Sequence, residues 1–588
     1  MRRAPNCQAA SLLFPRRARY RLVKPYKIII LGWDGATWDL LRPWTQSGEL
    51  PVLARLVAGG AAGSLQSIFP PTTAPAWTSM TTGTNPGRHG VLDWITRRPG
   101  TYNSMPFTAN SSTQKSMWEL LSEAGRRVFT FNVPMTYPPR PLNGAVVAGL
   151  GAPTVDSGFT YPPELAAEIK EVVGEYVLHP NPGQPDTDAE IEAFLQRLYH
   201  VTDIHMRTLD HLRSKEAWDS WMAVMSGTDA VQHVMWRFID PHHNRYDAQK
   251  SRRFGGEILR FFQYVDTSLG QLVDSLDEDT VLFLTSDHGF GPLAKWFHVN
   301  TWLLHEGFIV LKPGARTSLK RALFESGLTP MNAYRLLRSI GLGKLKEEVT
   351  PGRGRGRLRA LMPLLFLSFD DVDWSRTQAY AMGQIGPIYF NLKGREPQGV
   401  VEAGPGAEAL RLKIVERLHG LRDPETGEPI VGRIYRPEEL YTGSHLPSAP
   451  DIVFAPRFEA PGGQVPGFGE VDFGTNRPIA PMERGVTGVH RMHGVFLAYG
   501  KPVRPGVWLE GAQIVDVAPT ALHLAGLPVP EDMDGRVLVE ALQPGYADPA
   551  SLRYGPPAAR DSAGPAEVMS ADEQSILEER LRGLGYVA

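Results

Sequence analysis

The chain has 588 residues, of which 42% are hydrophobic and 21% are charged, and its formal net charge is -2. This is ordinary globular composition without a basic excess, so nucleic-acid binding is not expected as the main task. The single cysteine, Cys7, excludes an intramolecular disulfide, and no apolar run approaches the ~20 residues that span a bilayer. We therefore expect a cytoplasmic protein with no transmembrane segment.

The first 24 residues are rich in arginine and contain only a brief apolar group at 12–14. A signal peptide needs a longer apolar centre than this. We interpret residues 1–24 as a disordered basic leader; an alternative is that natural translation starts downstream of them.

Three continuous apolar segments are each followed closely by an aspartate. They are 26–31 before Asp34, 221–225 before Asp229, and 280–285 before Asp287. Continuous apolar strands are buried on both faces, as in a parallel sheet. Helical patterns such as 51–58 and 256–276 separate them, which predicts an α/β sandwich with a central, mostly parallel sheet flanked by helices. Open α/β sheets bind ligands beyond the carboxyl ends of their strands, so we expect the three carboxylates to share one edge.

The composition and the pattern of apolar residues change between about residues 291 and 481. Glycine-rich stretches at 351–356 and 402–406 predict loops, helical patterns occupy 319–340 and 407–418, and short strands lie near 379–380 and 388–390. We interpret this part as an inserted, cap-like region beside the main sheet.

The sheet pattern resumes at 494–499 and is followed by a helix at 517–525. Residues 546–588 are predicted to form a linker and a C-terminal helix, because proline, alanine and glycine dominate 546–569. Ser570 and Glu573 have the spacing of a capping box at the start of that helix. Its predicted apolar stripe consists of Ile576, Leu577, Leu581 and Leu584.

Six side chains of metal-binding type accompany the predicted strand ends: Asp34, Asp229, His233, Asp287, His288 and His490. Asp229 and His233 are four residues apart and share one face of a helical turn. Carboxylates and imidazoles are the ligands that two-metal phosphoryl hydrolases require, and a mixture of nitrogen and oxygen suits zinc best, with manganese and iron as alternatives. Each residue alone also fits a cap, a turn or a solvated pair, and only their joint occurrence predicts a metal site. His493 is the alternative to His490.

A candidate nucleophile lies at 69–80, where Thr72 and Thr73 precede Pro75. Proline suits the first turn of a helix, so these hydroxyls are expected at a helix N-terminus, where free N–H groups and the dipole favour a phosphate or an alkoxide. A threonine hydroxyl is a weak nucleophile until a base or a metal activates it. Either threonine could instead only cap the helix.

Taken together, these motifs resemble the alkaline-phosphatase superfamily, specifically the type I phosphodiesterase/nucleotide pyrophosphatase family. They are Gly-Trp-Asp-Gly at 32–35, the segment 69–77, Thr-Gly-Thr-Asn-Pro-Gly-Arg-His-Gly at 82–90, Asp229 with His233, Ser-Asp-His-Gly at 286–289 and Gly-Val-His at 488–490. The resemblance covers about 27–300 and 485–540. It implies a two-metal-dependent hydrolase that cleaves phosphate esters of the phosphodiester or nucleotide pyrophosphate type through a phosphothreonine intermediate.

The resemblance also implies roles for particular residues within a catalytic domain over 25–545. One metal would be held by Asp34, Thr73, Asp287 and His288, and the other by Asp229, His233 and His490. Thr73 is the implied nucleophile, with Thr72 as the alternative, while Asn85 and His89 are interpreted as structural support. The substrate would be a small-molecule phosphate ester, and no residue is assigned to binding it, although Lys295 and His298 follow the Asp287-His288 pair closely.

Other functions on the same scaffold remain open: a phosphomonoesterase, a phosphonate hydrolase, or a non-catalytic binding protein. A sulfatase would need a Cys/Ser-x-Pro-x-Arg motif, and none stands in the nucleophile segment. A cofactor-independent phosphoglycerate mutase should present a serine, and a phosphoethanolamine transferase should have spanning helices.

Overall fold

The computed structural model of the protein describes residues 24–330, 332–333, 365–384, 387–457, 466–468, 473–481, 485–548, 551–560 and 569–583. The predicted basic leader, except for Lys24, and the predicted loop at 351–356 lie outside these residues. Within the described part of the chain, no helix is long and apolar enough to cross a bilayer.

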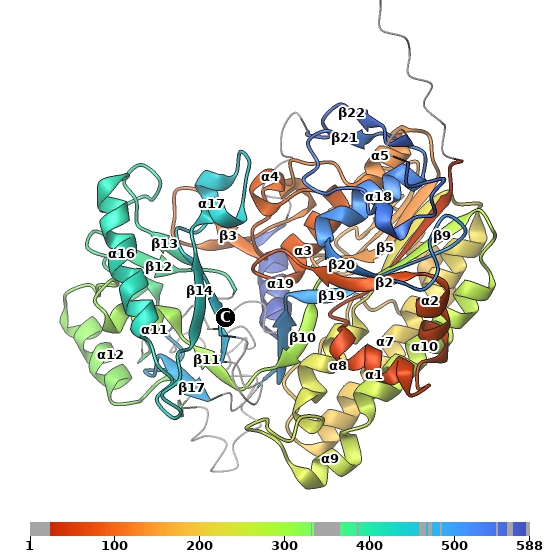
Figure 1. Cartoon of the computed structure of the whole chain (residues 1–588). Coiled ribbons are helices and arrows are strands. Elements are labelled where there is room, and N and C mark those ends of the chain that lie inside the picture. Colours follow the sequence, from red (N-terminus) through yellow and green to blue (C-terminus); the bar gives the residue numbers. More distant parts are fainter. Residues whose placement is uncertain are drawn as a thin grey trace, which may run out of the picture.

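A nine-stranded sheet forms the centre of the fold, in the order β20-β2-β19-β9-β1-β8-β5-β6-β7 (Figure 1). These strands are β1 (Lys27–Trp33), β2 (Ala61–Gln66), β5 (Val128–Val133), β6 (Gly144–Ala148), β7 (Thr160–Tyr161), β8 (Ser220–Met225), β9 (Thr280–Thr285), β19 (His493–Tyr499) and β20 (Val507–Gln513). The pairings β9–β1, β1–β8, β8–β5 and β5–β6 are all parallel, and β2 also pairs in parallel with β20. β19 is antiparallel to both of its neighbours, and β7 is antiparallel to β6. The predicted mostly parallel sheet is therefore confirmed.

Helices cover both faces of this sheet because β1, β8 and β9 are apolar on both sides. In β1, Ile28 and Ile30 belong to one apolar cluster, whereas Ile29 and Leu31 belong to another. The first cluster includes side chains from α3 (Thr73–Thr82), α5 (Met117–Glu123) and α18 (Val517–Leu524). The second includes side chains from α2 (Pro51–Gly59), α7 (Asp188–Lys215), α8 (Gly227–Met235) and α10 (Glu257–Asp274). The predicted α/β sandwich is confirmed.

Elements from the region between the sheet strands β9 and β19 lie beside the sheet, on the left in Figure 1. They include α11 (Val299–His305), α12 (Ala315–Glu325), β12 (Ala379–Ala381), β13 (Ile388–Phe390), α16 (Pro405–Gly420), β14 (Val431–Tyr435) and β15 (Val453–Pro456). The two ends of this region meet. β10 (Gly289–Pro292) pairs with β18 (Gly488–Arg491), and β11 (Lys295–Phe297) pairs with β17 (Ile479–Pro481). The first and the last elements of this region therefore pair with each other, close to where the chain leaves β9 and enters β19.

Two local expectations were wrong. The helix expected over 319–340 is interrupted, because α12 ends at Glu325 and Gly327 then adopts a left-handed conformation with φ of +90°, which an α-helix does not continue through. Residues 331 and 334–340 of the expected helix lie outside the described residues. The C-terminal helix α19 (Ala571–Gly583) is capped as predicted, since Ser570 N donates to Glu573 Oε2 at 2.8 Å. Leu577 and Leu581 are buried, but Ile576 is 41% exposed and does not belong to the apolar stripe. The predicted Leu584 lies outside the described residues.

Gly32, the first residue of the Gly-Trp-Asp-Gly motif, lies against the ring of Trp77. A Cβ atom at position 32 would overlap Cη2 of Trp77 and approach Cγ2 of Val224 to 3.0 Å. We predict that Gly32→Ala lowers the free energy of unfolding by about 1–3 kcal/mol, because an overpacked core must shift to accept the methyl group. Urea denaturation followed by tryptophan fluorescence measures this loss.

The matched control is Gly420→Ala at the end of α16, where an added Cβ meets nothing within 4 Å. This substitution should be neutral or slightly stabilising. Equal stability of the two variants would contradict the packing argument.

Candidate metal centre

Three neighbouring strands deliver three aspartates to one edge of the sheet. β1 is flanked by β8 and β9, with Trp33 opposite Met225 and Gly32 opposite Thr285. Asp34, Asp229 and Asp287 follow these register positions closely, so their side chains converge. None is more than 2% exposed. The structure thus places the three predicted carboxylates in one buried space.

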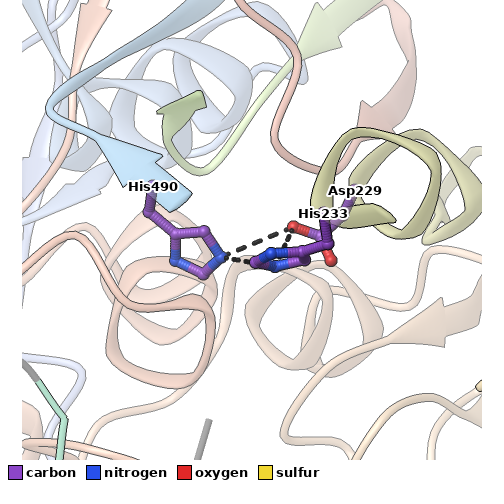
Figure 2. A group of neighbouring side chains, drawn as sticks. All are labelled: Asp229, His233 and His490. Carbon is purple, nitrogen blue, oxygen red and sulfur yellow. Dashed lines mark hydrogen bonds and ion pairs between the residues drawn. The ribbon is translucent and has the colours of Figure 1, made fainter. Parts of the chain in front are cut away.

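The first ligand group consists of Asp229, His233 and His490 (Figure 2). Asp229 and His233 project from α8, and His490 approaches them from β18 on the other side. Asp229 Oδ1 lies 3.2 Å from His233 Nε2 and 3.5 Å from His490 Nε2, and the two Nε2 atoms are 3.2 Å apart. One atom from each residue therefore faces a common point.

The second ligand group consists of Asp34, Asp287 and His288. His288 Nε2 lies 3.1 Å from Asp287 Oδ2 and 3.7 Å from Asp34 Oδ1. The hydroxyl oxygen of Thr73 lies 3.3 Å from the same Nε2 atom. In each group the potential ligand atoms are all within 4.8 Å of one another.

The two groups lie side by side. The rings of His288 and His490 are stacked, with centroids 3.5 Å apart and an angle of 18° between their planes. The structure therefore brings all seven residues predicted for the site into one cluster, divided into the two sets that the sequence motifs indicated.

Backbone carbonyl groups orient the three imidazoles. Nδ1 of His233 donates to the carbonyl of Gly488 at 2.8 Å, and Nδ1 of His490 donates to the carbonyl of Pro71 at 3.0 Å. Nδ1 of His288 faces the carbonyl of its neighbour Gly289 at 3.1 Å. A carbonyl only accepts, so each Nδ1 carries a proton that points to its carbonyl, and each ring turns its Nε2 atom into the cluster. This is the arrangement by which proteins orient metal-binding histidines.

The electrostatics of the carboxylates also fit a cation. Burial and the neighbouring carboxylates of Asp287 and Asp229 raise the pKa of Asp34 well above its usual range. Burial likewise raises the pKa of Asp287. Burial opposes the ionisation of Asp229, but the imidazoles of His233 and His490 lower its pKa well below its usual value. Oδ1 of Asp34 and Oδ2 of Asp287 are buried and accept no hydrogen bond. A divalent cation would supply both the missing partner and the missing positive charge.

The candidate nucleophile begins a helix, as its sequence predicts. Thr72 is the N-cap of α3, Thr73 is its first residue and Pro75 its third. Every residue of α3 is buried, and the indole Nε1 of Trp77 donates to Asp34 Oδ2 at 3.2 Å. This bond joins the helix that carries Thr73 to the second ligand group.

Several supporting contacts are not evident from the side-chain pattern. The backbone N–H of Gly35 donates to Asp287 Oδ1 at 3.2 Å, and Ser67 Oγ donates to the carbonyl of Asp287 at 2.6 Å. Trp77 and Gly35 lie within the sequence motifs quoted above, and this position was the only indication in the sequence that they support the site. The sequence gives no indication of which carbonyl groups orient the imidazoles, because every residue has a carbonyl group.

Other residues singled out in the sequence lie around this cluster in different roles. His493 is exposed at the start of β19 and belongs to neither ligand group. His89 is buried and shares a hydrogen bond of 2.9 Å with Ser79, while Asn85 caps α4 (Pro86–His89) and donates to Asp534 at 2.8 Å. The first contact joins α4 to α3, and the second joins the start of α4 to the segment that contains Asp534, in agreement with a supporting role.

The two basic residues that follow Asp287 and His288 are engaged elsewhere. Lys295 forms salt bridges with Asp423 at 2.7 Å and with Glu425 at 2.6 Å, both in the region beside the sheet. His298 is fully buried, and burial lowers its pKa to about 3, so its ring is neutral. Neither the salt bridges of Lys295 nor the buried ring of His298 indicates a substrate-binding role.

The nine-stranded sandwich and the ligand cluster at its edge define a protein of the alkaline-phosphatase-like α/β class. The model of the type I phosphodiesterase/nucleotide pyrophosphatase family matches residues 28–459, which is more than half of the chain. The chain belongs to this family, whose members are hydrolases of phosphate esters. No curated protein sequence matches the chain.

Solved structures similar to the chain include the human ectonucleotide pyrophosphatase/phosphodiesterase 5, with 13% identity, a TM-score of 0.46, and coverage of 88% of this chain and 98% of that one. The phosphonoacetate hydrolase from Sinorhizobium meliloti, solved with phosphonoformate, has 15% identity, a TM-score of 0.46, and coverage of 86% and 97%.

The crowded carboxylates generate a prediction for the protein treated with a chelator. A carboxyl group whose folded-state pKa is raised favours folding at low pH, and this contribution is lost as the pH rises through the raised value. Asp287→Asn removes one such group but keeps an oxygen for the N–H of Gly35. We predict that the chelated variant melts roughly 2 °C or more above chelated wild type at pH 8, with a smaller difference at pH 5.

Differential scanning calorimetry in buffer that contains a chelator measures these melting temperatures. Asp156→Asn, which changes an exposed aspartate, serves as the control and should leave the melting temperature unchanged. An Asp287→Asn variant that melts below wild type at both pH values would contradict the repulsion argument.

Proposed function

We propose that the chain hydrolyses phosphate esters, of the phosphodiester or nucleotide pyrophosphate type, through a phosphothreonine formed on Thr73. The single observation that carries this proposal is the position of the Thr73 hydroxyl, 3.3 Å from His288 Nε2, at the N-terminus of α3 and beside two groups of potential metal ligands. Family membership supports the phosphate-ester chemistry.

Two divalent cations, with zinc as the best-suited metal, would be held by Asp34, Thr73, Asp287 and His288 and by Asp229, His233 and His490. The donor set fits them, because it combines imidazole nitrogens with buried carboxylate oxygens. When bound, the cations supply Lewis-acid activation of the hydroxyl and neutralise charge on the phosphoryl group.

The residues of the chain then act in two steps. The Thr73 hydroxyl gives up its proton to solvent, and Oγ1 forms a bond to phosphorus as the bond from phosphorus to the leaving oxygen breaks; the leaving alkoxide takes up a proton from solvent. Water next attacks phosphorus, the bond to Thr73 Oγ1 breaks, and Oγ1 takes up the proton that the attacking water loses, which restores the hydroxyl. The N-terminus of α3 stabilises negative charge in both steps, since its N–H groups and dipole face the phosphoryl group.

Substitution of the nucleophile tests the proposal. We predict that Thr73→Ala lowers kcat on bis-p-nitrophenyl phosphate by a factor of roughly a thousand or more, because the substitution removes the hydroxyl that forms the intermediate. Thr72→Ala changes the adjacent N-cap residue and should retain most activity. Mass spectrometry of quenched reactions should find phosphate on Thr73 in the wild type.

Undiminished turnover by Thr73→Ala with intact metal content would refute the assignment, and loss of activity in Thr72→Ala alone would transfer the role to Thr72. Parallel assays with p-nitrophenyl phosphate, a phosphonate and a dinucleoside pyrophosphate distinguish the diesterase from the other hydrolases on this scaffold. A protein inactive on every substrate would fit a binding role instead.

Metal stoichiometry offers a test that does not depend on activity. His490→Ala should reduce bound zinc from two ions per chain to about one, because the first ligand group loses one of its three members. Plasma mass spectrometry after zinc loading and dialysis measures the content. His493→Ala removes the neighbouring exposed histidine and should retain two ions. An unchanged zinc content in His490→Ala would contradict the proposed ligand set.

A further inference from the structure

A small cavity of about 50 Å³ lies on the α3 side of the sheet, apart from the two ligand groups. Its walls come from the C-terminal half of α3, from β5 and β6, from the first turn of α5 and from Arg560 near the C-terminus. None of the seven residues of the proposed site lines it. An inference about this cavity is therefore independent of the proposed function.

Arg140 brings a positive charge to the cavity without a matching negative charge. It forms no salt bridge within the described part of the chain, and its Nη2 donates only to neutral groups, the carbonyl of Ala109 at 3.0 Å and Asn110 Oδ1 at 3.3 Å. Its Nε is buried and has no hydrogen-bond partner within the described ranges. Burial and the neighbouring Arg560 lower the pKa of Arg140, and the carboxylate of Glu119 opposes this effect only in part.

The other charged groups of the cavity compensate each other. Arg560 donates to both carboxylate oxygens of Glu119, at 2.7 and 2.6 Å, and Glu119 also accepts from the N–H and the hydroxyl of Ser116. Burial alone would raise the pKa of Glu119, but Arg560 lowers it, so this carboxylate is ionised. The Arg560–Glu119 pair is neutral overall, so the three charged residues that line the cavity carry a net positive charge.

Thr130 adds a second unsatisfied polar group. It lies in β5, lines the cavity and is only 1% exposed, and its hydroxyl has no hydrogen-bond partner among the residues that the structure describes. Buried polar groups are normally paired, so Arg140 Nε and the Thr130 hydroxyl, which belong to two residues lining the same cavity, call for a shared acceptor. Thr78 and Thr82 also line the cavity, but their hydroxyls donate to helix carbonyls at 2.8 and 2.7 Å and neither forms a hydrogen bond with Thr130.

We propose that this cavity binds one small oxyanion of the size of inorganic phosphate, held by the guanidinium of Arg140 and the hydroxyl of Thr130. An oxyanion supplies both the missing negative charge and the missing acceptor, and guanidinium groups bind such anions strongly. Pockets for drug-sized ligands measure about 300–1,000 Å³, so this cavity is far too small for a nucleotide. It is not a substrate pocket.

Titration of the full-length protein with inorganic phosphate at constant ionic strength tests the proposal. Isothermal titration calorimetry of wild type should detect a class of phosphate sites whose affinity falls about ten- to a hundredfold in Arg140→Gln, the range expected when a hydrogen bond to a charged group is lost. Thr130→Val should weaken the same class. Arg376→Gln, at an exposed arginine outside the cavity, should bind phosphate as wild type does.

Further measurements identify the ligand and protect the test from misfolding. Sulfate should compete for the class, whereas glycerol phosphate should not, because the cavity has no room for the glycerol. Thr130→Val removes an unpaired hydroxyl and should melt no lower than wild type in phosphate-free buffer, so it decides the matter even if Arg140→Gln folds poorly. Wild-type phosphate binding in Thr130→Val, or in a folded Arg140→Gln, would overturn the proposal, whatever the activity of Thr73→Ala.

Discussion

Three carboxylates crowded into one buried space set the central constraint on this structure. Asp34, Asp229 and Asp287 are each at most 2% exposed, so they lose hydration and repel one another. Two imidazoles offset the charge of Asp229, but the pKa values of the other two carboxyl groups are raised. Such an arrangement is unfavourable to folding by itself, and it persists because the apolar strands beneath it are buried on both faces and determine where their ends lie.

His490 is the last candidate ligand in the sequence, and about 200 residues separate it from His288. After β9 the chain leaves the nine-stranded sheet and re-enters it only in β19; just before that, β18 carries His490 and pairs with β10 in a separate two-stranded sheet. In this pairing Phe290 lies opposite His490, and the ring of Phe290 also contacts that of His233. Antiparallel pairing of β10 with β18 therefore positions His490 beside α8. The elements beside the sheet contribute in this way to the geometry of the ligand cluster.

Helix α3 connects three parts of the molecule. Its first residue is Thr73, Trp77 donates to Asp34, and Thr78 and Thr82 line the cavity near Arg140. A 10-residue helix is about 15 Å long, so these features lie within a short rigid element.

The sequence by itself determined the strands of the sheet centre and the identity of the candidate ligands. The segment predicted at 280–285 coincides with β9, because an uninterrupted apolar run of this length favours a strand that is buried on both faces, and the aspartates at the ends of neighbouring parallel strands share one edge. The sequence also placed Thr73 at a helix start through the preference of proline for the first turn.

Tertiary structure alone decided how these residues face one another. Lys295 is paired with Asp423, 128 residues away, and Ile576 is exposed although its spacing suits an apolar stripe. The orientation of the imidazoles depends on the carbonyls of Pro71, Gly289 and Gly488. Every residue carries a carbonyl, so only the path of the folded backbone selects the ones that accept these hydrogen bonds and turn the Nε2 atoms toward the cluster.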